Sequence, residues 1–232
     1  MYAKGLKRGI DFTLSLFSIL LLSPLLLLLM LVGAVAMRGN PFFTQLRPGR
    51  IDPATGRERI FRLVKFRTMS NARDREGKLL PDDVRLNAYG RLLRSTSLDE
   101  LPELFNILKG DMALVGPRPQ LVRDMVFMSA EQRRRHTVRP GLTGLAQIRG
   151  RNNITWEQKF EYDLEYIDAG ITAWGDLRIL FGTVGKVLSR KDTVREGTES
   201  DVDFGDWLLS KGEVAPEDYE RKQNEARELM EV

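Results

Sequence analysis

The longest uncharged stretch of the chain covers residues 12–37, which are 26 residues in a row. About 20 apolar residues are enough for a helix to span a bilayer. Pro24 lies near the middle of the stretch and bends or breaks a helix there, because proline has no amide hydrogen and clashes with the preceding turn. The adjacent Ser23 can satisfy the freed backbone group. The pattern therefore predicts a membrane-embedded helix that is broken at Ser23 and Pro24.

Three membrane arrangements fit this stretch. A signal peptide has a shorter apolar run, of about 7–15 residues, although residues 34–36 imitate a cleavage site. A straight span leaves one of two basic clusters on the wrong side, because positive charge collects on the cytoplasmic face. A re-entrant hairpin returns both ends to that face, and the flanking charges favour it. These charges are Lys4, Lys7 and Arg8 before the stretch and Arg38, Arg47 and Arg50 after it.

Beyond residue 37, the pattern predicts short elements. Residues 42–60 are rich in proline, glycine and arginine and predict loops and turns, whereas residues 60–69 are β-prone and predict a short strand or hairpin arm. Residues 71–83 are charged and irregular, and the glycine-rich residues 139–153 predict a loop without regular structure. Helical spacing predicts helices over residues 87–94, 98–109, 121–135, 156–167 and 176–188, and a last charged helix from Pro216.

Composition narrows the chemistry that the 232 residues can support. There is no cysteine and one histidine, His136, which we expect at the surface without a role. Thiol nucleophiles and histidine-based metal clusters are therefore excluded, and any metal would need oxygen ligands, which favours Mg²⁺. The first 195 residues carry a net charge of +12 and the remainder −8, so the basic part favours an anionic partner.

Two adjacent carboxylates, Asp99 and Glu100, are the strongest candidates for chemistry. The pattern from Ser97 to Glu100 fits a capping box, in which the side chains only cap the helix that follows. The functional interpretation uses the same position. A carboxylate in a first helical turn stays ionised, so Asp99 can attack phosphorus and Glu100 can hold Mg²⁺. The residues alone leave both interpretations open.

Basic residues supply candidate phosphate ligands. Arg118 lies between two prolines that fix its backbone, and a guanidinium fits phosphate in a bidentate fork. The alternative is an exposed arginine on a surface turn. Lys65 and Arg94 add positive charge or form ordinary salt bridges. Residues 139–144, which begin with Arg139, fit a nucleotide-cradling loop but match neither the Walker nor the Rossmann pattern.

In their joint order and spacing these motifs resemble the bacterial sugar transferases, the small monotopic phosphoglycosyl transferases that begin glycan assembly on a polyprenol. The resemblance extends from Lys7 to about Glu196 and is closest to the short members of the family. It rests on Ser23-Pro24, residues 44–49, Lys65-Phe66-Arg67-Thr68-Met69, residues 94–102, Leu108-Lys109-Gly110-Asp111-Met112, Val115-Gly116-Pro117-Arg118-Pro119, residues 138–144 and Gly150-Arg151-Asn152.

The resemblance implies a mainly α fold with a small β element. It implies a monotopic membrane protein at the cytoplasmic face of the bacterial inner membrane, with an N-terminal re-entrant helix broken by proline. The implied reaction moves a sugar 1-phosphate from a UDP-sugar to undecaprenyl phosphate and releases UMP. Residues 1–38 would then be the membrane helix, 39–195 the catalytic domain, and 196–232 an acidic tail to which no role is carried over.

The resemblance also assigns residues. Asp99 matches the nucleophile that carries a covalent phosphosugar, and Glu100 matches the Mg²⁺ ligand. The expected substrate-binding residues are cationic: Lys65, Arg94, Arg118 and Arg139.

Two other classes of protein compete with this interpretation. One is a membrane-anchored adaptor without catalysis, whose basic part docks on anionic lipid or a partner. The other is a nucleic-acid-binding protein, suggested by the basic run at residues 133–135. Because no familiar nucleic-acid motif is present and aromatic residues do not interleave with the basic run, we expect no nucleic-acid partner.

Overall fold

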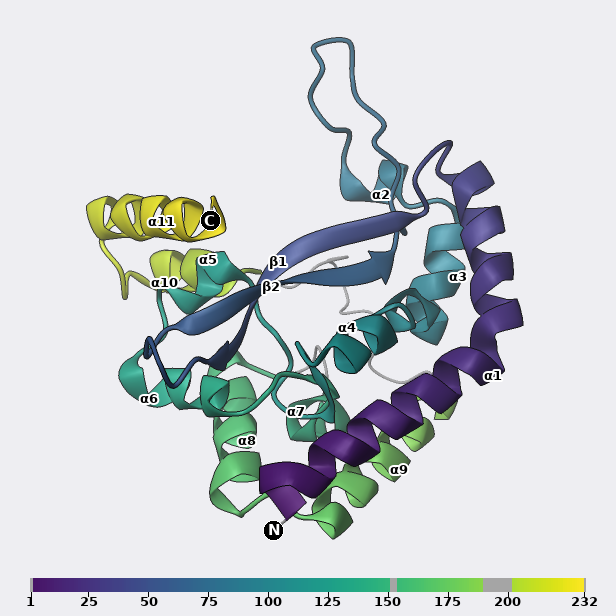
Figure 1. Cartoon of the computed structure of the whole chain (residues 1–232). Coiled ribbons are helices and arrows are strands. Elements are labelled where there is room, and N and C mark those ends of the chain that lie inside the picture. Colours follow the sequence, from purple (N-terminus) through teal and green to yellow (C-terminus); the bar gives the residue numbers. More distant parts are fainter. Residues whose placement is uncertain (1, 151–153, 190–201, 232) are drawn as a thin grey trace.

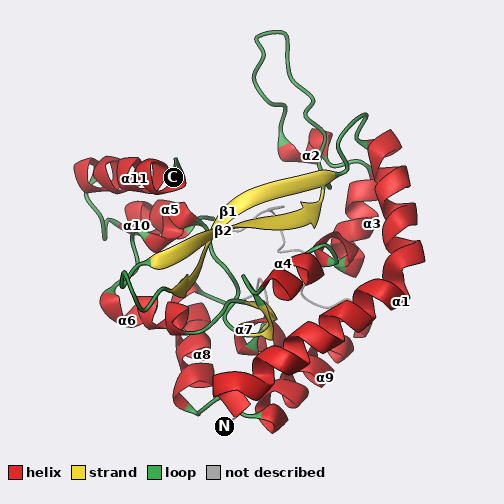
Figure 2. Ribbon diagram, in the orientation of Figure 1, coloured by secondary structure: helices red, strands yellow, loops and turns green. Residues whose placement is uncertain are grey.

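The computed structural model describes residues 2–150, 154–189 and 202–231, and it is mainly helical with two small sheets (Figures 1 and 2). The predicted mainly α fold with a small β element is confirmed. The described helices are α1 (Lys7–Ala36), α2 (Asp82–Arg85), α3 (Ala88–Thr96), α4 (Glu103–Lys109), α5 (Val122–Met125), α6 (Ala130–Arg133), α7 (Leu145–Arg149), α8 (Trp156–Asp168), α9 (Ala173–Ser189), α10 (Phe204–Lys211) and α11 (Pro216–Met230), with short turns η1 (Tyr2–Leu6), η2 (Leu98–Glu100) and η3 (Arg134–Thr137). The strands are β1 (Phe42–Ile51), β2 (Glu58–Phe66), β3 (Ala113–Val115) and β4 (Gly141–Thr143).

β1 and β2 form an antiparallel ribbon, although the sequence predicted loops and turns over residues 42–60. β1 was not predicted because Pro48 and Gly49 are disfavoured inside sheets. A two-stranded ribbon, however, has only edge strands, where proline is tolerated. The register shifts between Pro48 and Ile51, so the irregularity is confined to one place. The strand predicted over residues 60–69 is confirmed as β2, which carries Lys65 near its end.

β3 and β4 form a parallel pair where the sequence predicted a loop without regular structure, so that prediction is wrong for β4 and for α7. The backbones of Gly141 and Gly116 lie so close together that a Cβ on Gly141 would be 2.1 Å from the amide nitrogen of Gly116. The amide of Gly141 also donates to the carbonyl of Pro117 at 2.9 Å. The loop that begins with Arg139 therefore lies directly against the loop that carries Arg118. Residues 151–153 lie outside the described chain.

The helix predicted over residues 98–109 is two elements. Ser97 adopts a left-handed conformation with φ of 56°, η2 follows, and α4 begins only after Pro102. The side chain of Ser97 does not cap η2, and Glu100 pairs with two cations instead of capping back. The capping-box interpretation is therefore wrong. Gly110, with φ of 95°, ends α4 as predicted.

The helix predicted over residues 121–135 is also broken, into α5, α6 and η3, because Ser129 and Gln132 form a capping box that starts a new helix. The basic run at residues 133–135 is neutralised by ion pairs within the chain, of which those of Arg134 are at the surface. Its pairs are Arg133 with Glu58, Arg134 with Glu131 and Asp168, and Arg135 with Asp163. His136, expected at the surface, is buried with Nδ1 3.0 Å from Glu58. The helices predicted over residues 87–94, 156–167 and 176–188 are confirmed as α3, α8 and α9.

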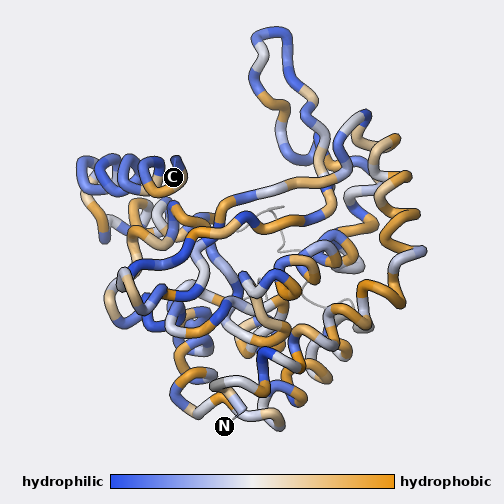
Figure 3. Tube along the Cα trace, viewed as in Figure 1, coloured by the Kyte–Doolittle hydropathy of each residue, from blue (hydrophilic) through white to orange (hydrophobic). Residues whose placement is uncertain are grey.

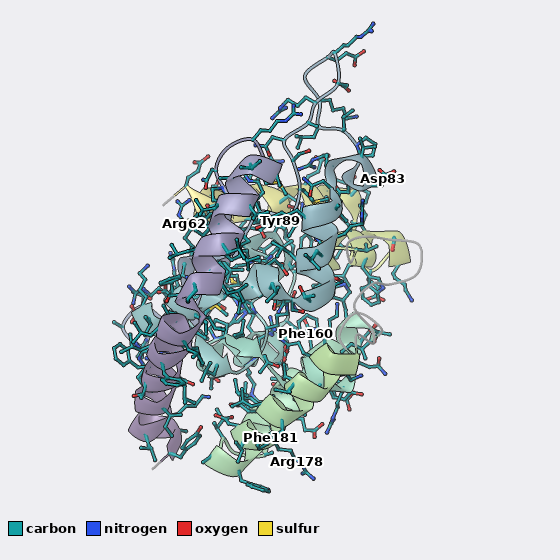
Figure 4. The ribbon with its side chains drawn as sticks, turned by 90° about the vertical axis from the view of Figure 1, so that its right-hand side faces the viewer. Arg62, Asp83, Tyr89, Phe160, Arg178 and Phe181 are labelled. Carbon is teal, nitrogen blue, oxygen red and sulfur yellow. The ribbon has the colours of Figure 1, made fainter. Side chains whose placement is uncertain are left out.

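α1 is one helix of 30 residues that bends along its length (Figures 1 and 4). Pro24 lies inside it, and the hydroxyl of Ser23 donates to the carbonyl of Leu20 at 2.8 Å. That carbonyl is the group that an amide at position 24 would have bonded. The predicted break is therefore a bend in a continuous helix, with its freed carbonyl satisfied.

The first half of α1 is fixed to the rest of the molecule. The guanidinium of Arg8 donates to the carbonyls of Ile107 and Leu108, at the C-terminal end of α4, at 2.6 and 2.7 Å. Oδ1 of Asp11, which is buried, accepts from the amide of Leu114 in β3 at 3.2 Å. α1 is thereby tied to the helix and the strand on either side of the Gly110 turn.

Large apolar side chains remain exposed on α1 and α9. Figure 3 colours the hydrophobic positions of both helices orange. α1 is long and apolar enough to cross a membrane, and only 11% of its most apolar window is buried. α9 exposes Trp174 by 73% and Phe181 by 69%. Both helices lie on the side of the molecule that Figure 4 turns to the reader.

The C-terminal helices α10 and α11 pack against α5 and α8. Phe204 and Leu208 of α10 and Ala226 of α11 are buried in a cluster with Trp156 and Phe160. The predicted helix start at Pro216 is confirmed, and the helix covers part of the core while its charged side faces out.

Candidate functional site

A cavity of about 1110 Å³ opens between β2, η2 and the loop after β3, and it extends to α7, α9 and the residue before α10. Its wall contains five of the six residues that the sequence predicted for catalysis or substrate binding. These are Lys65, Arg94, Asp99, Glu100 and Arg118. The fold therefore brings together residues that are up to 53 positions apart in the chain.

Glu100 lies at the centre of a cluster of charges in this wall. Its Oε1 is 3.0 Å from Nζ of Lys65 and also accepts from Nη2 of Arg118. Lys65 is shared, because its Nζ lies 3.1 Å from Glu103 as well. The cluster places two cations beside Asp99, where the negative oxygens of a phosphate could be bound.

The environment differentiates the two adjacent carboxyl groups. Burial, and then the charge of Glu100, raise the pKa of Asp99 to about 6. Burial alone would raise the pKa of Glu100 too, but the charges of Arg118 and Lys65 outweigh it and hold that pKa well below its usual range. Glu100 is therefore a firmly ionised partner of two cations. Asp99 is an anion that its surroundings stabilise poorly, which favours reactivity at its oxygen.

Two arginines donate hydrogen bonds to backbone carbonyls of the loop that carries Arg118. Nη2 of Arg135 donates to the carbonyl of Arg118 at 2.6 Å, and Nη1 of Arg47 donates to the carbonyl of Pro119 at 3.1 Å. Arg135 is itself paired with Asp163 at 2.6 Å, and the two side chains are 1% and 3% exposed. The backbone that directly follows the Arg118 side chain is thus fixed by a buried and a half-buried arginine.

Arg94 and Arg139 have different surroundings. Nε of Arg94 donates to Oγ1 of Thr68 at 3.1 Å, which holds the guanidinium at the cavity wall. Nε of Arg139 donates to the carbonyl of Gly110 at 2.9 Å, and Arg139 is not among the residues that line the cavity. A part for Arg139 in substrate binding stays a prediction that its position does not support.

Four residues of the cavity wall or its support had no assigned role in the sequence. Arg47 lies in the motif at residues 44–49, which could have drawn attention to it, and its Nε has no hydrogen-bond partner among the described residues. Arg135 was hidden inside a basic run that suggested a surface patch. Arg123 and Asp203 carry no sequence signal, because they meet only when α10 packs on α5.

The donor atoms that a metal ion could use are carboxylate oxygens. Within the part of the chain that the structure describes, no three His, Cys, Asp or Glu side chains are grouped to hold a metal ion. Oε1 of Glu100 already accepts from Lys65 and Arg118, which leaves Oε2 as its freer oxygen. The arrangement suits an ion that takes most of its ligands from substrate and water, as Mg²⁺ commonly does.

Comparison with known protein families gives an independent result. The family model described as bacterial sugar transferase matches residues 2–190, which include every residue of the charged cluster. An uncharacterized sugar transferase, EpsL of Bacillus subtilis, is 48% identical over 183 residues, which are 79% of this chain and 87% of that protein.

Two further relatives have more specific names. Each is named UDP-glucose:undecaprenyl-phosphate glucose-1-phosphate transferase. The Klebsiella pneumoniae protein is 39% identical over 78% of this chain and 39% of its own length. The Caulobacter vibrioides protein is 37% identical over 79% of this chain and 70% of its own length. The chain thus matches nearly all of the Bacillus protein and well under half of the Klebsiella protein.

Proposed function

Because this chain belongs to the bacterial sugar transferases and is therefore a transferase, we propose that it moves a sugar 1-phosphate from a UDP-sugar to undecaprenyl phosphate. The products are UMP and undecaprenyl diphosphate sugar, and the reaction would be the first membrane step in the assembly of a glycoconjugate. The names of the Klebsiella and Caulobacter relatives support the donor and the acceptor. Family membership disfavours the alternative of an adaptor without catalysis.

One observation carries the proposal: Asp99 lies in a large cavity beside a cluster in which Glu100 holds Lys65 and Arg118. Lys65 and Arg118 would bind the diphosphate of the donor. Phosphoryl transfer depends mainly on positioning and on stabilising charge at the phosphate oxygens, which fixed cations in a cavity wall provide.

In the first step, a carboxylate oxygen of Asp99 attacks the β-phosphorus of the UDP-sugar. A bond forms between that oxygen and phosphorus, the bond from the β-phosphorus to the bridging oxygen breaks, and UMP leaves with the electron pair. The poorly stabilised negative charge of Asp99 suits this role. The sugar phosphate stays on Asp99.

In the second step, a phosphate oxygen of undecaprenyl phosphate attacks the same phosphorus. The bond from phosphorus to the Asp99 oxygen breaks, and the carboxylate is restored. Lys65 and Arg118 would hold the phosphoryl oxygens through both steps.

Mg²⁺ is part of the proposal as a ligand of Glu100. The oxygen donors fit a hard cation that is completed by phosphate oxygens and water. When bound, Mg²⁺ supplies positive charge that offsets the charge of the diphosphate. Chelation with EDTA should stop UMP release, and added Mg²⁺ should restore it.

The membrane placement rests on α1 and α9. We propose that α1 enters the cytoplasmic face of the inner membrane as a re-entrant hairpin bent at Pro24, with both ends on that face. The exposed apolar residues of α9, including Trp174 and Phe181, would lie at the same membrane surface. In this proposal, residues 1–38 are the membrane element and residues 39–195 are the catalytic part.

A burst experiment tests the covalent step. The protein in detergent is mixed with a panel of UDP-sugars without acceptor, and UMP is measured together with the mass of the peptide that contains Asp99. We expect about one UMP per protein and a peptide heavier by one sugar phosphate, both absent in Asp99→Asn. Asp83→Asn, on the exposed helix α2, is the matched control and should behave as wild type. Full turnover by Asp99→Asn, or an adduct on another residue, would overturn the mechanism.

A further inference from the structure

Beyond the charged cluster, the cavity has two chemically different sides. On the side of β4, α7 and α9 its lining contains the apolar residues Leu142, Ala146, Ile148, Leu180 and Val184, interspersed with Thr143, Gln147, Thr183 and Lys186. On the β1, α5 and α10 side its lining is polar, with Gln45, Arg47, Gln120, Arg123 and Asp203. Figure 1 shows α9 near α1, whereas α5 and α10 lie across the molecule from them.

If the proposed function holds, these two sides separate the two substrates. An isoprenoid chain suits the α9 side, because the apolar lining residues Leu180 and Val184 continue along the same helix into the exposed Phe181. The polar side is then left for the hydroxyl groups and amides of the nucleotide sugar.

The backbone around Asp203 is fixed at the edge of this polar side. The carbonyl of Val202 accepts from Nε1 of Trp156 at 3.1 Å. The amide of Phe204 donates to Oδ1 of buried Asp124 at 2.8 Å, and the Phe204 ring packs in the core cluster. Residue 203 therefore has little freedom to move, although it lies at the start of a helix that could otherwise fray.

The side chain of Asp203 is oriented by Arg123. Oδ2 of Asp203 pairs with Nη2 of Arg123, and the two side chains are 20% and 50% exposed. A carboxylate has about four acceptor positions, so one guanidinium contact leaves capacity for ligand hydroxyls. The pair thus presents an oriented acceptor, with further arginine donors beside it, to the cavity.

We propose that Asp203, oriented by Arg123, is a donor-binding residue that accepts hydrogen bonds from hydroxyl groups of the nucleotide sugar. This rests on the proposed function and names the part of the chain that completes its donor site. The family model ends at residue 190, so Asp203 lies outside the region by which the family is recognised. The C-terminal segment is then a wall of the catalytic cavity as well as a cover for the core.

Steady-state kinetics of UMP release test the proposal, with Asp203→Asn as the main variant. A lost hydrogen bond to a charged group costs roughly tenfold or more in affinity. We expect the KM for the UDP-sugar to rise about tenfold, with kcat and the KM for undecaprenyl phosphate changed less than twofold. Donors that differ at one hydroxyl then locate the contact: a changed preference among them places it on the sugar, and an equal loss for all places it on the ribose.

Asp206→Asn is the matched control, because Asp206 lies three residues further on in α10 and bonds Tyr219 outside the cavity lining. Arg123→Gln provides a second variant that keeps both backbone anchors of Asp203, and its donor KM should rise as well. Unchanged donor KM in Asp203→Asn and Arg123→Gln, or an equal rise in Asp206→Asn, overturns the inference. Absence of UMP release from the wild type with every UDP-sugar would instead overturn the proposed function.

Discussion

The buried guanidinium of Arg135 holds the backbone carbonyl of Arg118 at 2.6 Å. Arg118 is a residue of the cavity wall that bonds Glu100, whereas Arg135 is 1% exposed, does not line the cavity and is paired with Asp163. One arginine is therefore available to bind a ligand, and the other positions it from inside the core.

Arg135→Lys should separate these two roles. A lysine keeps the charge, but its single ammonium cannot reproduce the planar fork that bonds both Asp163 and the Arg118 carbonyl. At an assay temperature well below unfolding, we expect kcat for UMP release to fall about tenfold. The free energy of unfolding should fall by about 1–3 kcal/mol. Arg134→Lys, at the exposed neighbouring position, should change neither quantity. Wild-type kcat in Arg135→Lys would remove Arg135 from the positioning of Arg118.

Glu58→Gln should destabilise the fold in a pH-dependent way. Burial would raise the pKa of Glu58, but hydrogen bonds from His136 and Arg133 outweigh it and lower the pKa from 4.5 to about 2. A lowered carboxyl pKa gives stability that is fully present above the unfolded value and is lost as pH falls through the folded value. We expect a loss of about 3 kcal/mol at neutral pH, the cost of breaking a buried pair.

Urea unfolding followed by tryptophan fluorescence measures this effect. The difference between wild type and Glu58→Gln should be constant above about pH 5 and should shrink as the pH falls from 4.5 to 2. Glu131→Gln breaks an ion pair that is largely exposed, so it should cost less than about 1 kcal/mol. An equal difference at all pH values would show that the Glu58 charge is not what stabilises the fold.

Gly141→Ala should disrupt the contact between the two motif loops. Its Cβ would lie 2.1 Å from the Gly116 amide nitrogen, and neither backbone can yield without breaking the β3–β4 pair. We expect a loss of about 3 kcal/mol or more in unfolding free energy, together with loss of UMP release. Gly185→Ala in α9, with nothing within 4 Å of its Cβ, should instead be neutral or slightly stabilising. A stable, active Gly141→Ala protein would contradict the tight pairing.

Pro24→Ala tests the membrane arrangement. Restoring an amide at position 24 allows a straight helix, which would send one end of α1 across the membrane. Since the chain has no cysteine, single cysteines at Gly5 and Gly39 report each end without background. In spheroplasts, an impermeant maleimide should label neither cysteine while Pro24 is present, until the inner membrane is opened. In Pro24→Ala, one of the two cysteines should be labelled from outside. Labelling of position 5 from outside while Pro24 is present would show a spanning arrangement.

Much of the architecture could be predicted from local patterns. Asn87 caps α3 and Pro216 opens α11, and both helices follow from chemistry within a few residues of their start. β1 could not be predicted, because its Pro48 and Gly49 are tolerated only through pairing with β2. The pairing of Gly141 with the loop after β3 links residues 25 positions apart, and no local signal specifies it.

For the site as well, motifs predict residues correctly, but contacts between distant residues have no local signal. Asp99, Glu100, Lys65 and Arg118 could be selected from their motifs, and the fold gathers them. At Ser97 the sequence pattern predicted a helix cap, and this prediction was wrong. Its left-handed backbone instead makes the turn that leads into η2 and Asp99. Arg135 and Asp203 could not be found, since their parts depend on where distant carbonyls and helices lie after folding.

The hydrogen bond from the amide of Leu114 to Asp11 has a mechanical consequence. Leu114 belongs to β3, which leads directly into the loop of Arg118. α1 and the arginine that we propose as a phosphate ligand are therefore linked through a few covalent and hydrogen bonds. Any tilt or vertical displacement of α1 that follows a change in lipid thickness would reach the reaction centre as strain. With α1 embedded in the bilayer as proposed, lipid thickness would act on the rate through this link, without a dedicated regulatory ligand.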